Sequence, residues 1–438
     1  TGGGRALGLQ LDNRGTVTIA QAVTLNGSSA DHLNSGTITL SGGDFTVSQG
    51  GSTPSFTTTG TMDIPSGRTF TVSGGTFNYD AGTVGGAGTV NLSSATANFT
   101  PNFSTATTAL RLAGTTLNGP GTVTHAVGQT LNADNSTINA ALVNQGLLVF
   151  RGSGNNLGGS FENQAGATVR LLGDATFDNA VVNVALGFTN LGVIELTSVG
   201  GEGAAVLNVS SGSLVNAAGG QLNVLAGTGG GRALGLQLDN RGTVTLAQTV
   251  TLNGSSAAHR NSGTITLSGG DFTVSRGTFV NATPGLIQGF GTLDIRFTSF
   301  TNAGNVNPGA SPGILTVGGD FPQTATGHLN IEIGGRTAGD DYDQLNVTGH
   351  ATLGGTLDVR LINGFRPSGG DSFEILRYNS QAAFFDHITG LNIGGGFFFQ
   401  PIFSATNVVL TTIDTRPRIG FQSARLLSVP AAREPSAA

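Results

Sequence analysis

Carboxylate side chains are the groups in this sequence best suited to chemistry, and they are sparse. Residues 1–305 contain fourteen Asp and Glu residues, spread along the whole segment. Cleaving a polysaccharide by general acid–base catalysis requires carboxylates that converge on one bond. Asp44 and Asp271 instead occupy equivalent positions of a duplicated segment, which indicates a repeated turn-capping role. We therefore expect the chain to have no catalytic residues and not to be an enzyme.

The densest acidic cluster is Asp340, Asp341 and Asp343, which surround Tyr342, with Glu332 nearby. Oxygen ligands at this spacing are of the kind that Ca²⁺ prefers. The cluster lacks, however, the Asp-x-Asp-x-Asp-Gly frame of a calcium loop. The sequence favours a solvated turn here, and calcium binding by Asp340, Asp341 and Asp343 stays an open alternative.

Other reactive groups are absent or isolated. The sequence has no Cys, which excludes thiolate metal sites, disulfides and Cys nucleophiles. Its Gly-rich strings lack the Lys-Ser/Thr of a phosphate loop, and no Gly-x-Ser-x-Gly elbow occurs. We expect neither a cofactor nor a metal. The His residues never show ligand spacing and are expected at isolated surface or turn positions: His32, His125, His259, His328, His350 and His387.

The composition describes the scaffold that must position these groups. Of 438 residues, 72 are Gly, and charged residues make up 10% with Arg as the only basic type besides His. A net charge of −6 argues against nucleic-acid binding. No apolar run is long enough for a transmembrane helix, so we expect no membrane-spanning segment. Hydrophobic residues still reach 37%, enough for a core.

Two levels of repetition run through the chain. Residues 1–50 return at 228–277 with 45 of 50 positions identical, which indicates an internal duplication. A shorter period places Asn-x-Gly or Gly-x-Gly turns before strands that alternate Thr with Val, Ile or Leu, once every ~20–30 residues. This is the length of one β-solenoid coil. In the strand at 16–19, we expect Val17 and Ile19 to point inward while Thr16 and Thr18 face water.

We therefore predict an all-β parallel β-helix, or β-solenoid, with a β-rich carboxy-terminal capping module. Coils occupy 1–305, the module 306–413, and a loosely ordered tail 414–438. The one helix candidate is short, around Ser380 to Phe385. The module is expected to contain longer strands at 314–317, 328–333, 344–347, 356–362, 373–376 and 408–413.

The segment NPGASPGILTVGGDFPQTATGHLNIEIGG, followed by DDYDQLNVTGHATLGGTLDVRLINGF and GDSFEILRYNSQAAFF, resembles a known module. It is similar to the carboxy-terminal module of bacterial surface proteins of the autotransporter-associated-repeat and filamentous-adhesin type. The landmarks are Ser-Pro-Gly at 311–313, Tyr342-Asp343 and Gly-Gly-Thr-Leu at 354–357. The resemblance covers about 310–412 and implies a β-helical passenger at a bacterial cell surface.

Three functional classes follow. The first is an extracellular structural or adhesive rod of a bacterial surface, with head-to-tail assembly into fibres as one mode of action. The second is a carbohydrate-binding or polysaccharide-cleaving β-helix. The third is an ice binder, for which Thr-x-Thr strands such as those at 16–18 and 37–39 provide the pattern. Dispersed carboxylates disfavour cleavage and coils without the Thr pair disfavour ice binding, so we favour the first.

The expected partners are other copies of the chain, with surface polysaccharide as a further candidate. Thr1 to Leu11 has the sequence of an ordinary coil strand, and its duplicate at 228–238 lies mid-chain. A solenoid end exposes unpaired backbone groups that natural proteins normally cover. We expect this end to be covered, by a preceding part of a longer chain or by the carboxy-terminal module of the next molecule.

Overall fold

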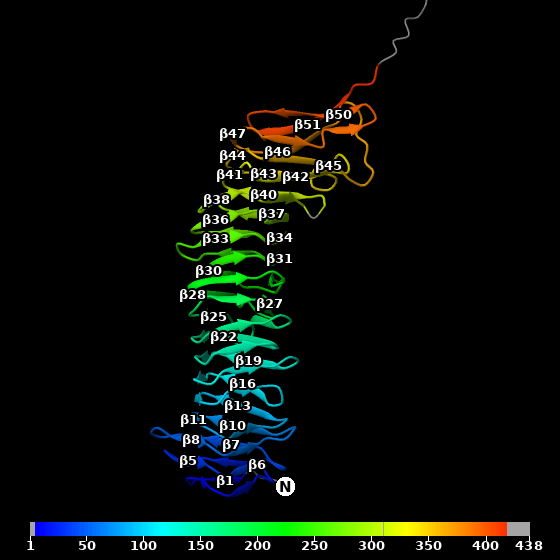
Figure 1. Ribbon diagram of the computed structural model, residues 1–438. Coiled ribbons are helices and arrows are strands. Elements are labelled where there is room, and N and C mark those ends of the chain that lie inside the picture. The colour runs from blue at the N-terminus through cyan, green and yellow to red at the C-terminus, as the bar shows by residue number, and fades with distance from the viewer. Residues whose placement is uncertain (1–4, 310, 418–438) are drawn as a thin grey trace, which may run out of the picture.

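The computed structural model describes residues 5–309 and 311–417, and these form an all-β protein without a helix. The chain winds into a parallel β-solenoid of about 15 turns. Figure 1 shows the turns stacked along one axis, from β1 at one end to β42 and β45 near the other. The predicted solenoid is confirmed.

Three parallel ladders run along the rod, because each strand pairs with the strand that follows one turn later. Ladder 1 consists of β1 (Arg5–Leu7), β4 (Val23–Leu25), β7 (Phe45–Ser48), β10 (Thr69–Ser73), β13 (Thr89–Ser93), β16 (Ala109–Ala113), β19 (Thr130–Asp134), β22 (Leu147–Leu157), β24 (Thr168–Asp174), β27 (Val193–Val199), β29 (Gln221–Val224), β31 (Thr243–Leu246), β34 (Thr264–Ser268), β37 (Leu286–Asp294), β39 (Asn305–Pro308), β42 (His328–Ile333), β45 (Thr356–Leu361) and β48 (His387–Thr389).

Ladder 2 lies beside it and shares β22 and β37, which continue around a corner. Its other strands are β2 (Asp12–Asn13), β5 (Asp31–Asn34), β8 (Ser55–Thr58), β11 (Thr76–Tyr79), β14 (Thr96–Phe99), β17 (Thr116–Asn118), β20 (Thr137–Ile138), β25 (Ala180–Val184), β28 (Ala205–Asn216), β30 (Arg232–Asn240), β32 (Val250–Leu252), β35 (Phe272–Val274), β40 (Ile314–Gly318), β43 (Gln344–Val347) and β46 (Ser372–Arg377).

Ladder 3 comes in three pieces, and its middle piece includes the second halves of β28 and β30. The first piece is β3 (Thr16–Thr18), β6 (Thr37–Thr39), β9 (Thr61–Asp63) and β12 (Thr83–Gly85). The middle piece adds β15 (Phe103–Ser104), β18 (Val123–His125), β21 (Leu142–Asn144), β23 (Phe161–Asn163), β26 (Phe188–Asn190), β33 (Ala258–Asn261), β36 (Thr278–Asn281) and β38 (Ser299–Asn302). The last is β41 (Phe321–Pro322), β44 (His350–Thr352) and β47 (Ser380–Ala382).

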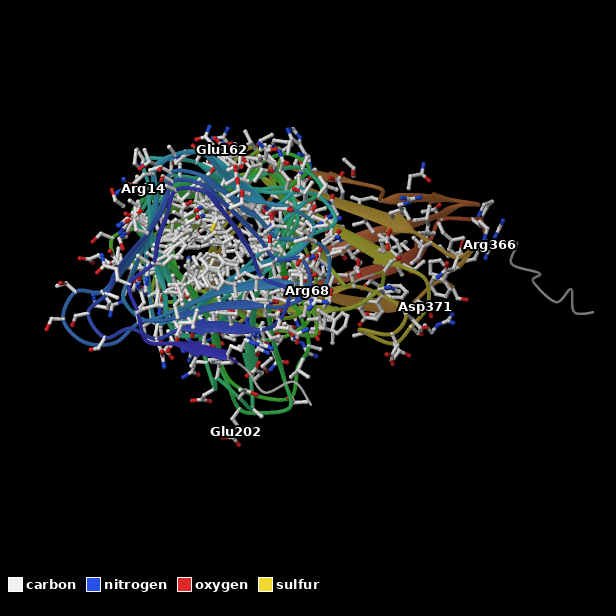
Figure 2. The ribbon with its side chains drawn as sticks, turned by 90° about the horizontal axis from the view of Figure 1, so that it is seen from below. Arg14, Arg68, Glu162, Glu202, Arg366 and Asp371 are labelled. Carbon is white, nitrogen blue, oxygen red and sulfur yellow. The ribbon has the colours of Figure 1, made fainter. Side chains whose placement is uncertain are left out.

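The core is a continuous column inside these ladders. Side chains alternate along each strand, so one residue points inward and the next outward. Thr16 and Thr18 are exposed, Ile19 is buried and Val17 is half-buried, as predicted. Aromatic rings stack between turns; the ring centroids of Phe45 and Phe70, for example, lie 5.6 Å apart. Figure 2 shows the carbon-rich interior, with labelled charged residues at the periphery.

Buried asparagines form a side-chain ladder at one corner. The Asn144 Nδ2 donates to Asn163 Oδ1 at 2.8 Å, and the Asn163 Nδ2 donates to Asn190 Oδ1 at 2.6 Å. Each inner amide therefore donates to one neighbour and accepts from another, which satisfies polar groups that would be costly to bury unpaired. The same contact continues through Asn216, Asn240, Asn261, Asn281, Asn302 and Gln323.

The two copies of the duplicated segment lie on different ladders. β1 belongs to ladder 1, whereas the corresponding residues of β30 pair in ladder 2. Likewise β3 belongs to ladder 3, but its counterpart β31 pairs in ladder 1. The duplicated sequence therefore forms the same kind of turn on different ladders of the rod.

The strands predicted near the carboxy terminus are confirmed within about one residue by β40, β42, β43, β45, β46 and β51 (Asn407–Asp414). Parallel pairing continues across residue 305, through β37, β39 and β42. Antiparallel pairing then joins β46, β51, β50 (Phe397–Phe403) and β49 (Asn392–Gly394). The division at 305/306 stays a prediction. Of the predicted tail, residues 418–438 lie outside the described residues.

The predicted short helix around Ser380 to Phe385 is wrong. Ser380–Ala382 forms β47, which pairs in parallel with β44. Ala383 then has a φ of 60°, a left-handed conformation that a right-handed helix does not allow. Pairing with a neighbouring turn thus overrides the weak local helix signal.

Candidate functional site

The equivalent carboxylates of the duplicated segment tie one turn to the next. Asp44 Oδ1 accepts the backbone N–H of Thr69 at 3.0 Å, and Asp271 Oδ1 accepts that of Thr292 at 2.7 Å. Both contacts cap backbone donors, which is the repeated structural role that their positions predict. Neither side chain joins a cluster of other carboxylates.

The acidic cluster near residue 340 is not a uniformly solvated turn. Asp343 is only 2% exposed, and its two oxygens accept backbone N–H groups from Gly313 and Glu332, both at 2.9 Å. Burial raises the pKa of Asp343 to about 7, although the two backbone hydrogen bonds favour its charged form. Asp341 instead caps the amides of Arg336 and Thr337. The expectation of a solvated turn is therefore wrong for Asp343, because its buried side chain accepts hydrogen bonds from the backbone of two other segments, at Gly313 and at Glu332.

A groove lies beside Asp343 on the outer face of ladder 1. Its volume is about 510 Å³, and consecutive strands supply its floor. Thr266 and Gln288 come from β34 and β37, and the Gln288 Nε2 donates to Thr266 Oγ1 at 3.1 Å. Asn307 and Asn330 come from β39 and β42, and the Asn330 Nδ2 donates to Asn307 Oδ1 at 2.6 Å. We call this the junction groove, lined further by Glu332, Asp343, Asp358 and Arg360.

The charged residues of the junction groove are arranged asymmetrically. Asp358 contacts His328 Nδ1 at 2.9 Å and also accepts from Thr389 Oγ1. Glu332 accepts from Ser311 Oγ at 2.5 Å. Arg360 is exposed and makes no ion pair with any residue that the structure describes. The groove thus combines engaged carboxylates with a guanidinium that is available to a ligand.

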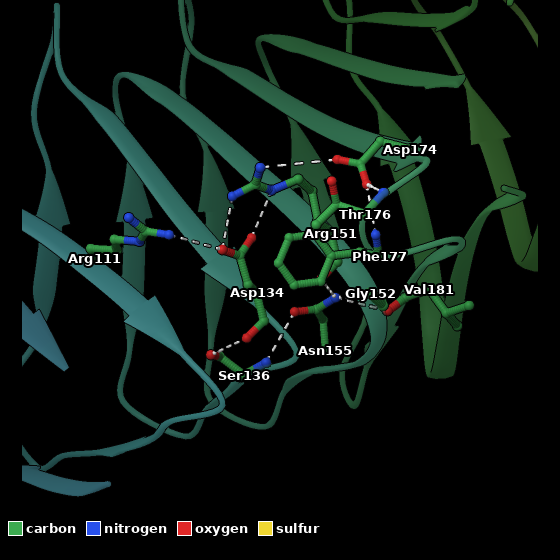
Figure 3. Close-up of polar contacts among 10 residues, drawn as sticks. All are labelled: Arg111, Asp134, Ser136, Arg151, Gly152, Asn155, Asp174, Thr176, Phe177 and Val181. Carbon is green, nitrogen blue, oxygen red and sulfur yellow. Dashed lines mark hydrogen bonds and ion pairs between the residues drawn. The ribbon is translucent and has the colours of Figure 1, made fainter. Parts of the chain in front are cut away.

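A second charged cluster, shown in Figure 3, centres on the buried carboxylate of Asp134. Arg151 donates from Nε and Nη2 to the two carboxylate oxygens of Asp134, each at 2.8 Å. Its guanidinium carbon also lies 4.8 Å from the centre of the Phe177 ring, and its Nη1 is 4.0 Å from Asp174. Asp134 is 2% exposed. This bidentate pair fixes the corner of β22. Arg111, whose side chain is 55% exposed, approaches the same carboxylate at 3.9 Å.

The prediction that all His residues occupy surface or turn positions is wrong for His32, His125 and His259, which are 2%, 0% and 1% exposed. His32 Nδ1 accepts the Leu11 N–H at 3.1 Å, and His259 Nδ1 accepts the Leu238 N–H at 3.3 Å. Burial lowers the pKa of His259 to about 4. These rings act as neutral acceptors between turns.

The Thr pairs proposed for an ice-binding face do not share one face. Those at 16–18 and 37–39 lie in ladder 3, whereas the pairs of β31 and β34 lie in ladder 1. Within 5–309 and 311–417, no group of three or more His, Asp or Glu side chains is arranged to hold a metal ion. Nor does this part of the chain contain a helix suited to cross a membrane.

The sequence singled out Glu332 and Asp343 as part of an acidic cluster but did not connect them with the rest of the junction groove. Most of the other lining residues come from different turns, so no local motif contains them. One signal was present: Asp358-Val359-Arg360 repeats the Asp-x-Arg spacing seen at Asp12-Asn13-Arg14 and elsewhere. No protein-family profile matches the chain, and a search of curated proteins also finds no significant match.

Proposed function

We propose that the protein is an extracellular structural or adhesive rod of a bacterial surface. The observation that carries the proposal is the unbroken stack of about 15 turns, built on a core column and a buried amide ladder. Such a scaffold holds its two ends at a fixed distance and offers long, uniform faces. The resemblance of residues 310–412 to a bacterial surface module supports the location.

The outer faces agree with this role. The outward row of ladder 1 is polar and mostly uncharged over long stretches. The matched positions toward the carboxy-terminal end are Asn223, Thr245, Thr266, Gln288 and Asn307. Uncharged hydroxyl and amide groups keep such a face soluble without attracting polyanions or polycations.

Self-association through the ends is the second part of the proposal. Leu7 and Leu9 are 42% and 46% exposed at the first described turn. Among the described strands, β1 pairs with β4 alone, so one of its edges is open. An open edge with apolar side chains accepts a further strand. Head-to-tail stacking of copies would be heterologous and would yield filaments.

Negative-stain electron microscopy and sedimentation of the purified chain test the assembly. We expect filaments that lengthen with protein concentration, because each added copy covers the edge of the previous one. Ala6→Pro should prevent them, since Arg5 and Leu7 direct their backbone groups to β4 and Pro at position 6 removes the donor on the open edge. Leu9→Ala, which keeps every backbone donor, should shorten them less. Monomers at every concentration, with identical behaviour of the Pro variant, would reject end-to-end assembly.

Location is tested separately in the native host. Protease treatment of intact cells should remove the protein if it lies on the outside, while a cytosolic marker survives. Protection until the cells are lysed would contradict an extracellular role.

The absence of a catalytic centre is also part of the proposal. Asp343 is held by backbone amides, Glu332 by Ser311, and Asp358 by His328, so the groove carboxylates already have partners. We expect incubation with neutral and acidic polysaccharides to release neither reducing ends nor unsaturated products. Turnover that is lost in Glu332→Gln would overturn this.

A further inference from the structure

We propose that the junction groove binds a neutral polysaccharide chain. The inference deepens the proposed adhesive role by naming a ligand class. It rests on the geometry of the floor, on the amide and hydroxyl side chains there, and on the charges around Arg360.

The floor of the groove runs along the rod. Gln288, Asn307, Asn330 and Asp358 come from four successive strands of ladder 1, and neighbouring strands lie ~4.8 Å apart. An elongated ligand laid on this row meets one polar side chain per turn. A compact ligand would contact only one or two of them, so the row favours an extended chain.

The chemistry of the floor suits hydroxyl groups. Each amide offers both an N–H donor and a carbonyl acceptor, as a sugar hydroxyl does. None of the described residues that line the groove is aromatic, and pockets for apolar ligands are usually lined by aromatic and hydrophobic side chains. The volume of about 510 Å³ is sufficient for a short stretch of a glycan.

Arg360 differs from the other arginines that follow an Asp at this spacing. In four other Asp-x-Arg sequences the Arg pairs with the Asp two residues before it: Arg14, Arg241, Arg296 and Arg416. In Asp358-Val359-Arg360 the Asp358 carboxylate instead forms hydrogen bonds with His328 and Thr389. The Arg360 guanidinium, which lines the groove and is exposed, therefore makes no ion pair within the described part of the chain.

The charges around the groove disfavour an acidic ligand. Glu332, Asp343 and Asp358 line the groove beside the single guanidinium of Arg360, so the groove repels a polyanion. A neutral glycan avoids this repulsion, and its hydroxyl groups can accept hydrogen bonds from Arg360 and donate to Glu332 or Asp358. Acidic polysaccharides are therefore poorer ligands, and the basic polymer in the test shows whether the carboxylates favour a cation instead.

Affinity electrophoresis of the full chain tests the proposal, with dextran, mannan and mixed-linkage β-glucan in the gel as probes. Alginate and chitosan serve as acidic and basic polymers. We expect at least one neutral polysaccharide to retard the chain. Asn330→Ala and Arg360→Gln should each weaken that retardation about tenfold, because each removes hydrogen bonds made to the ligand.

Matched controls separate binding from folding. Asn98 also belongs to an interturn amide pair, donating to Asn78 Oδ1 at 2.8 Å, but lies many turns away. Asn98→Ala and Arg14→Gln should leave retardation unchanged. No retardation by any neutral polymer, equal losses in the control variants, or retardation by alginate or chitosan alone would overturn the inference. These results leave rod formation and surface location untouched, since microscopy and protease treatment test those directly.

Discussion

Residues 5–50 and 232–277 have nearly the same sequence but differ in burial over their first few residues. Leu7 and Leu9 of the first copy are 42% and 46% exposed, whereas Leu234 and Leu236 of the internal copy are each 1% exposed. β30 is paired on one side with β28 and on the other with β32 and β33. The burial of an amphipathic strand therefore depends on the turns stacked on either side of it and not on its own sequence.

The difference persists at the start of the second turn, where Val23 is half-buried and its counterpart Val250 is fully buried, and then fades. Phe45 and its counterpart Phe272 are 2% and 1% exposed, and Ile38 and Ile265 are both fully buried. The two copies thus become equivalent once further turns cover them on both sides. Pairs of identical residues in the two copies consequently provide matched experiments on the contribution of stacking.

The largest expected difference is for leucine truncation. Leu236→Ala should lower the free energy of unfolding by about 2–5 kcal/mol, since it leaves a cavity in the core. Leu9→Ala, at a half-exposed position, should cost less than about 1 kcal/mol. Urea unfolding followed by circular dichroism under dilute conditions measures both. Equal losses would show that the first turn is as tightly packed as the internal one.

Glycine substitution gives the next difference. A Cβ at Gly242 would lie 2.2 Å from the backbone oxygen of Gly220, whereas a Cβ at Gly15 meets no atom within 4 Å. Gly242→Ala should therefore destabilise the chain by about 1–3 kcal/mol. Gly15→Ala should change stability by no more than about 0.5 kcal/mol. Thermal unfolding of the two variants side by side checks this, and a neutral Gly242→Ala would contradict the close approach.

The amide ladder provides a third pair. Asn240 accepts from Asn216 at 2.8 Å and donates to Asn261 at 2.7 Å, whereas Asn13 donates to Asn34 at 2.7 Å and begins its run. Asn240→Ala orphans buried groups on two neighbours, so it should cost about 1–2 kcal/mol more than Asn13→Ala. Chemical unfolding of both variants measures the difference. Identical costs would mean that the ladder contributes no more inside the rod than at its end.

The smallest effect is a pH dependence. Burial lowers the pKa of His259 to about 4, so the unfolded chain binds the proton more readily below about pH 6.5. Protonation of His259 therefore favours the unfolded chain, and the free energy of unfolding decreases as the pH falls from about 6.5 towards 4. In the first copy Asp31 raises the pKa of His32, opposing burial, and Ala258 replaces that Asp next to His259.

Ala258→Asp should therefore make stability less sensitive to pH across this interval, and His259→Gln should do so more strongly. Unfolding midpoints at pH 4.5 and 7 measure the change, with His387→Gln as an exposed control. A control variant that changes the pH slope as much as His259→Gln would refute this assignment.

Local sequence patterns predicted the strands well, because the alternation of polar and apolar residues and the positions of the Gly turns determine strand bounds within a single coil. The strand at 328–333 was predicted with its observed bounds. The same patterns could not show which ladder a strand joins, since that depends on how many residues all preceding turns contain. The different ladders of β3 and β31 arise in this way.

The candidate site was harder to predict, for a related reason. Asn307, Asn330 and Asp358 meet only because each turn returns the chain to the same face. Likewise, nothing near His259 in the sequence shows that the next turn covers it. The solenoid period could have aligned these residues only if every turn had the same number of residues. The turns differ in length.

Cysteine labelling tests most directly the claim that stacking, within a chain or between chains, buries these strands. The chain has no Cys, so Leu9→Cys and Leu236→Cys each introduce a single thiol for reaction with a maleimide. The account predicts that Leu236→Cys reacts slowly at all protein concentrations. Leu9→Cys should react rapidly when dilute and become protected as concentration rises and ends associate. A rapid rate for Leu9→Cys that does not change with concentration would contradict end-to-end assembly.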